Sequence, residues 1–168
     1  SRGLGDVYKR QLEAFLGRGG LTTRRIGDGH SNLTFLVTGP GTSVVVRRPP
    51  PPPLPPGAHD VLREARMVAG VAGHGVPVPE VLATAEPGEV IDAPLYVMSH
   101  VEGPVVTTAT PDALATPGHR RAVAESFVDT LARLHAIDPV PAGLDGMGRP
   151  EGFNARQLRR IRQLLDPY

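Results

Sequence analysis

Small and polar residues gather in one short turn between two strand-like runs. Residues 26–37 read Ile-Gly-Asp-Gly-His-Ser-Asn-Leu-Thr-Phe-Leu-Val, and the glycines Gly27 and Gly29 permit positive φ and close approach to the backbone. Ser31 and Asn32 add side-chain hydrogen-bond donors. Such a tip suits an anion such as phosphate, although an ordinary tight hairpin is the alternative. It is not the G-x-G-x-x-G dinucleotide fingerprint, because Asn32 stands where the third Gly would fall.

Two cations end the next strand-like run. Residues 43–48 read Ser-Val-Val-Val-Arg-Arg, and side-chain alternation along a strand places Val45 and Arg47 on one face and Arg48 on the other. A helix is expected from about residue 60 to residue 72, with Glu64 in its first turns. These charged side chains can also be simply solvated, which leaves their role open at this point.

A third feature is a strand that leaves its sheet as a polar connection. In residues 94–103, Tyr96 and Met98 alternate with apolar residues of the opposite face, as a two-residue period requires. Where the strand ends, the backbone at Ser99 and Val101 offers N–H and C=O groups beside an apolar wall. Such an edge can pair with a purine base through backbone groups alone.

The order of these features resembles the nucleotide-binding lobe of the protein-kinase-like fold. More narrowly, it is similar to the aminoglycoside phosphotransferase family, including the branch found beside acyl-CoA dehydrogenases. The resemblance implies an α+β fold, in which a five-stranded antiparallel sheet with one packed helix precedes the first helices of a truncated lower lobe. It covers about residues 12–168 and rests on residues 29–32, 45–50, 64, 76–79, 96–99, 131–135 and 148–153.

The resemblance also implies how ATP would bind to the upper lobe. The Ser99 carbonyl and the Val101 N–H would pair with adenine, Met98 would form the back wall, and Val45 would cover one face of the ring. The turn residues and the Arg47–Glu64 pair would serve the phosphates. The phosphate-covering residues are Gly29, His30, Ser31 and Asn32.

Arg47 departs from the pattern of most kinase-like proteins, which have Lys at this position. The resemblance to the branch found beside acyl-CoA dehydrogenases implies that Arg is accepted at this position. Arg keeps the positive charge but is longer and planar, so it grips phosphate or carboxylate in a different geometry.

The residues that would complete catalysis have no counterpart in the sequence. The family's His-Gly-Asp run is missing, since His-Gly occurs only as His74-Gly75, and the later Asp that would hold Mg²⁺ is missing too. We therefore expect the full-length parent to be an ATP-dependent and Mg²⁺-dependent kinase for a small-molecule hydroxyl, and this segment to be inactive alone. The acceptor is not specified by the sequence. A nucleotide-binding, catalytically inactive scaffold is the alternative.

Composition excludes several other classes of protein. Eighteen basic and 17 acidic residues give a net charge of +1, so neither nucleic acid nor a membrane surface is expected as a partner. Without Cys there is no disulfide framework, thiolate catalysis or Cys-based zinc site, and the six His lack the spacing of a helical metal site. The absence of a long apolar run or signal-peptide pattern predicts a cytoplasmic protein, and the composition suggests a GC-rich bacterial source.

We expect four parts along the chain. Residues 1–11 look like a non-native leader, with a natural N-terminus as the alternative; residues 12–98 form the nucleotide-binding lobe, 99–106 a hinge, and 107–168 the incomplete lower lobe. Residues 49–56 hold seven Pro, which predicts a surface loop, or alternatively a ligand for proline-binding domains. Strands are expected at residues 22–26, 33–38, 42–48, 81–85 and 95–99, and helices at 12–16, 60–72, 117–137 and 154–165.

Overall fold

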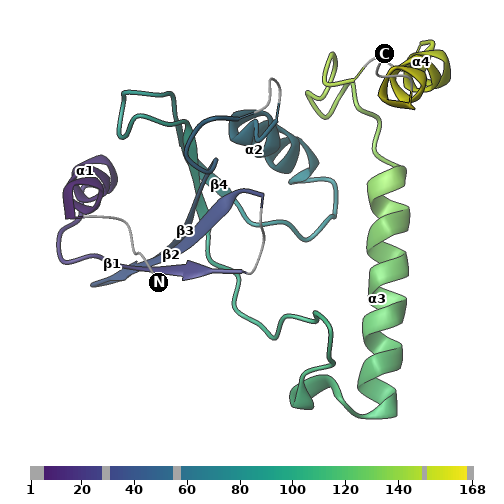
Figure 1. Cartoon of the computed structure of the whole chain (residues 1–168). Helices are drawn as coiled ribbons and strands as arrows, with labels where there is room; N and C mark the ends of the chain where they lie inside the picture. The colour runs from purple at the N-terminus through teal and green to yellow at the C-terminus, as the bar shows by residue number, and fades with distance from the viewer. Residues whose placement is uncertain (1–5, 28–30, 55–57, 149–150, 166–168) are drawn as a thin grey trace. The chain divides into compact units, whose positions relative to one another are not determined.

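A five-stranded antiparallel sheet forms the centre of the first part of the chain. The computed structural model describes residues 6–27, 31–54, 58–148 and 151–165 (Figure 1). The strand order is β1-β2-β3-β5-β4. The strands are β1 (Thr22–Ile26), β2 (Leu33–Gly39), β3 (Thr42–Arg48), β4 (Val81–Ala85) and β5 (Leu95–Ser99), and the helices are α1 (Asp6–Leu16), α2 (Val61–Val71), α3 (Pro117–His135) and α4 (Phe153–Leu165), with a short 3₁₀ turn η1 (Asp112–Leu114).

The chain divides into two compact units, Ser1–Ile137 and Asp138–Tyr168. The first contains the sheet and α1 to α3, and the second contains α4. None of the helices in the described ranges is long and apolar enough to span a bilayer. The α+β fold and all five strands are confirmed, with β2 one residue longer than expected.

Short connections make β1, β2 and β3 an antiparallel meander, as the sequence predicted. Gly39 pairs with Thr42, so only Pro40 and Gly41 turn the chain. Gly41 has a φ of 66°, a conformation that favours glycine. Gly39 is needed for another reason, because a Cβ there would come within 2.7 Å of the Leu21 side chain.

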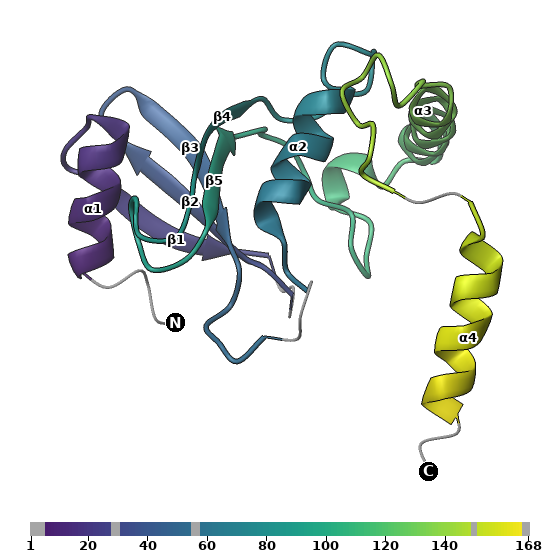
Figure 2. The same ribbon diagram turned by 90° about the horizontal axis from the view of Figure 1, so that it is seen from above.

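Helices cover both faces of the sheet. Figure 2 shows α1 on one side and α2 on the other. On the α2 side, Val61 and Ala65 pack against Tyr96, and all three are almost completely buried. The prediction of a single packed helix was therefore incomplete. The cluster on the α1 side contains Leu12, Leu21, Val37, Val44, Val46, Ala85, Val90, Ile91, Leu95 and Val97.

Side-chain caps fix where α2 and α3 begin. The Asp60 carboxylate accepts a hydrogen bond from the Arg63 N–H at 2.9 Å, and the Thr116 hydroxyl accepts from the His119 N–H at 3.2 Å. Each cap satisfies a backbone donor that has no partner within the helix. Thr116 as N-cap and Pro117 as the first helical residue were predicted from the sequence.

Two expectations need correction. Helix α1 begins at Asp6, so it includes residues of the suspected leader, and its Leu12 is 3% exposed in the core. Whether residues 1–11 are native stays a prediction.

In the proline run, Pro51, Pro52 and Pro53 are exposed as expected, but Pro49 is buried because it follows β3 directly and is still at the sheet. Residues 55 and 56 of this run lie outside the described ranges.

Two leucines in neighbouring strands test how the core is built. Leu95 is 1% exposed in β5, whereas Leu82 is 48% exposed in β4. We expect Leu95→Ala to lower the free energy of unfolding by about 2–5 kcal/mol through lost burial and a cavity. The matched Leu82→Ala change should cost about 0.5 kcal/mol or less. Urea unfolding followed by circular dichroism measures both, and equal losses would contradict this assignment of the core.

Candidate functional site

The strand register places three polar side chains in one row across the sheet. Arg47 of β3 lies opposite Thr34 of β2 on one side and opposite Tyr96 of β5 on the other. Two residues along, on the same face, Leu36, Val45 and Met98 form a parallel apolar row.

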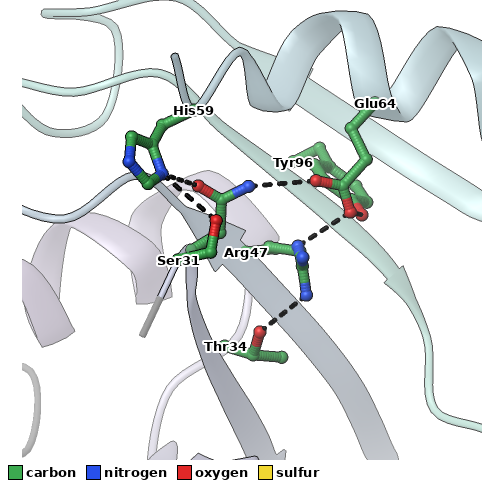
Figure 3. A network of polar contacts seen from close by, with 7 residues as sticks. Ser31, Thr34, Arg47, His59, Glu64 and Tyr96 are labelled. Atoms are coloured by element: carbon green, nitrogen blue, oxygen red, sulfur yellow. Dashed lines mark hydrogen bonds and ion pairs between the residues drawn. The ribbon is translucent and has the colours of Figure 1, made fainter. Parts of the chain in front are cut away.

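The carboxylate of Glu64 on α2 closes over the polar row (Figure 3). Its Oε1 lies 2.8 Å from the Nε of Arg47 and accepts a hydrogen bond from the Tyr96 hydroxyl at 2.9 Å. Its Oε2 accepts from the Asn32 amide at 3.0 Å. The contact between Arg47 and Glu64 is therefore confirmed, and both carboxylate oxygens have partners.

Arg47 uses different nitrogens for different partners. Its Nε makes the ion contact with Glu64 without hydrogen-bond geometry, and its NH1 donates to the Thr34 hydroxyl at 3.1 Å. Side-chain exposure is 29% for Arg47 and 33% for Glu64, so solvent screens the pair in part. We therefore infer that this pair does more to orient the two side chains than to stabilise the fold. A Lys with its single nitrogen could not reproduce this arrangement.

Tyr96 is held in its neutral form. Burial raises the pKa of the Tyr96 hydroxyl, and the negative charge of Glu64 and the hydrogen bond to it raise it further, while the charge of Arg47 acts in the opposite direction. A neutral hydroxyl can donate, so Tyr96 donates a hydrogen bond to the Glu64 carboxylate while the charge of Arg47 compensates its negative charge.

A cleft of about 580 Å³ opens on the same face of the sheet. The predicted residues Val45, Met98, Ser99 and Val101 all line it. Arg47 and Glu64 are not part of its lining, but Thr34, which accepts the Arg47 hydrogen bond, is. The remaining lining residues are Arg24, Ile26, Leu36, Pro77, Pro79, His100, Glu102, Gly103 and Val105.

Hydrogen bonds fix the end of β5 at the edge of this cleft. The Ser99 N–H donates to the Glu80 carbonyl at 2.8 Å, and the Glu80 N–H donates to the Ser99 hydroxyl at 2.9 Å. Val101 is 67% exposed, and within the described ranges its N–H has no hydrogen-bond partner. A donor at the rim of an apolar cleft is thus available to a ligand.

The turn residues divide into two groups. Gly29 and His30 lie outside the described residues. Ser31 and Asn32 contact the ring of His59, and Asn32 also reaches Glu64. No group of three His, Cys, Asp or Glu side chains in the described ranges is arranged to hold a metal ion.

Sequence reasoning missed several residues of this region, among them Thr34, Tyr96, Arg24 and His59. Thr34 and Tyr96 join the Arg47 contacts through strand register, which alternation within one strand does not specify. Arg24 enters the cleft lining from β1. His59 follows the proline run, where no periodic pattern carries a signal.

The raised pKa of Tyr96 gives a pH-dependent prediction. Because the pKa of Tyr96 is raised, the folded protein keeps this proton at pH values where the unfolded chain has lost it. The resulting contribution to the free energy of unfolding is complete below the ordinary Tyr pKa of about 10 and declines as the pH rises above it. Tyr96→Phe should lower stability by about 1–2 kcal/mol at pH 7 and reduce the loss of stability between about pH 10 and 11. Urea unfolding across pH 7–11 measures both, with Tyr8→Phe as the control; an unchanged alkaline slope would contradict the assignment.

Comparison with known proteins agrees with the geometry. Residues 22–168 match the sequence profile described as the phosphotransferase enzyme family. Acyl-CoA dehydrogenase family member 11 of Gallus gallus is 36% identical over 88% of this chain, and the human protein is 33% identical over 82%. The chain spans only 19% and 18% of the lengths of these two relatives.

A solved structure supports the same relationship. It comes from Ralstonia eutropha, and its assignment as an aminoglycoside phosphotransferase is provisional. It matches 96% of this chain with a TM-score of 0.74 and 28% identity, and the match covers 47% of that protein. The resemblance identified in the sequence is thus confirmed, and the chain belongs to the phosphotransferase enzyme family.

Proposed function

We propose that this chain is the ATP-binding lobe of a phosphotransferase that moves the γ-phosphate of ATP to a hydroxyl group of a small molecule. The observation that carries the proposal is the Arg47–Glu64 pair, which stands on the same sheet face as the cleft and its hinge. A cation fixed beside an apolar pocket suits a ligand with a flat apolar end and an anionic end.

The apolar end of the cleft suits adenine. Val45 and Met98 come from the apolar row and give two walls, and the Val101 N–H provides a donor at the rim. In this arrangement the Ser99 carbonyl and the Val101 N–H pair with the edge of the base. Backbone groups specify the base by hydrogen bonds, while the apolar walls supply most of the buried area.

The polar row suits the phosphates. Arg47 contacts Glu64 through Nε and Thr34 through NH1, so its NH2 group is the nitrogen that we assign to a phosphate. Ser31 and Asn32 add hydrogen-bonding groups from the turn, which also contains Gly29 and His30. Mg²⁺ would neutralise phosphate charge in the full-length parent, and the described residues of this chain do not supply its ligands.

The alternative is a kinase-like scaffold that binds nucleotide without transferring phosphate. Such a scaffold would have the same cleft, so the residues of this chain do not distinguish the two functions. A His-Gly-Asp loop followed by a later Asp in the full-length parent would favour the enzyme. In either case we propose a cytoplasmic protein whose partners are ATP and an unidentified small molecule, with neither nucleic acid nor membrane as a partner.

Calorimetric titration with Mg-ATP tests the proposal. We expect the 168-residue chain to bind weakly, with a dissociation constant of about 1 mM, because only one side of the ligand is covered. A version extended with the rest of the native protein should bind in the micromolar range, a gain of about 4 kcal/mol. Binding tighter than about 10 µM by the chain alone would contradict the half-covered cleft, and no binding by the extended protein would refute nucleotide binding.

A hinge variant tests the orientation of adenine. Val101→Pro removes the backbone donor, whereas Val101→Ala keeps the donor and shortens the exposed side chain. In the extended protein, loss of this hydrogen bond should weaken adenosine binding about tenfold in the Pro variant, and the Ala variant should change it by less than about threefold. Equal effects of the two variants would show that the Val101 N–H does not contact the base.

A further inference from the structure

His59 has an unusual backbone conformation immediately before α2. Its φ is 62°, and it is the one non-glycine residue with positive φ in the described ranges. Histidine tolerates this region better than most residues, but the conformation still needs support from its surroundings. The following residue, Asp60, is the N-cap of α2, so the His59 ring is anchored to the start of that helix.

The ring of His59 reaches the hairpin tip of the proposed nucleotide site. Its Nδ1 lies 3.0 Å from the Asn32 side-chain oxygen and 3.4 Å from the Ser31 hydroxyl. These contacts join residues 27 and 28 positions apart in the sequence. Figure 3 shows the His59 ring beside Ser31, and the Asn32 amide bonds to both His59 and Glu64.

The hydrogen bonds determine which ring nitrogen carries the proton. The Asn32 amide nitrogen donates to Glu64 Oε2 at 3.0 Å, and an ionised carboxylate can only accept, so the amide oxygen must face His59. An amide oxygen also only accepts, so Nδ1 of His59 must be protonated. The Ser31 oxygen can then only accept from this same N–H, which leaves the Ser31 O–H free to donate elsewhere.

We propose that His59 is a positioning residue of this site, which acts through its Nδ1–H. The ring fixes Asn32, which fixes Glu64, and Glu64 in turn orients Arg47. The same N–H holds the Ser31 oxygen so that its hydroxyl proton can donate to a phosphate of the nucleotide. The phosphate role rests on the proposed nucleotide binding, whereas the protonation of Nδ1 and its coupling to Glu64 do not.

The first experiment measures the protonation state without any ligand. Long-range ¹H–¹⁵N NMR of the 168-residue chain at pH 8 distinguishes the two ring nitrogens of a neutral imidazole. We expect His59 to show the Nδ1–H form. A spectrum of the Nε2–H form would overturn the proposal, whatever the chain binds.

The second experiment separates positioning from general stability. His59→Gly keeps the positive φ and removes the ring, whereas His59→Asn keeps a tolerance for that φ and a side-chain donor. His74→Gly, an exposed histidine at the other end of α2, is the matched control. NMR titration can measure dissociation constants in the millimolar range, so it is used for both Mg-ATP and adenosine. The Arg47 Nε–H resonance reports whether the guanidinium has changed its surroundings.

The proposal predicts a phosphate-specific loss. His59→Gly should weaken Mg-ATP binding about tenfold and adenosine binding less than twofold, and it should shift the Arg47 Nε–H signal. His59→Asn should show a smaller change in each of these quantities, and His74→Gly should change none of them. Equal weakening of both ligands, or an unmoved Arg47 signal, would overturn it. Failure of the unmodified chain, and of its extended version, to bind either ligand would refute the proposed function, and the ring protonation and Arg47 signal would still decide the role of His59.

Discussion

The carboxylate of Glu64 is the point on which the site depends. Arg47 from β3, Tyr96 from β5 and Asn32 from the β1–β2 connection all contact it, although Asn32 and Tyr96 are 64 positions apart in the chain. Its exposure of 33% means that water still screens its charge, so its contribution to stability is modest. What it provides is relative position, because one anion with two oxygens contacts three segments, two through hydrogen bonds and one through an ion pair.

The register of the sheet makes this meeting possible. Thr34, Arg47 and Tyr96 are direct cross-strand neighbours, and the apolar row beside them contributes to the cleft. A shift of β3 by one residue would turn Arg48 toward α2 and Arg47 toward α1. The hydrophobic contacts of Val44 and Val46 with the α1 side oppose such a shift, so packing on one face determines chemistry on the other.

The sequence predicted the elements better than the contacts between them. Apolar and β-branched runs located all five strands, and alternation together with the family order put Arg47 on the α2 face. The beginning of α1 was missed because its first residues were excluded as a leader, and Pro49 was placed on the surface from composition alone. The contact of His59 with Asn32 depends on a positive φ after an aperiodic proline run, and no pattern in the residues carries that information.

Arginine in place of the usual lysine changes how the cation and the turn are related. A lysine ammonium would meet every partner through one nitrogen, whose three N–H donors can serve more than one acceptor. Arg47 instead reaches its partners through separate nitrogens, since Nε contacts Glu64 and NH1 is bound to Thr34. Because Glu64 also binds Asn32, the turn and the guanidinium contact the same carboxylate. One side chain of α2 therefore joins the turn to the cation.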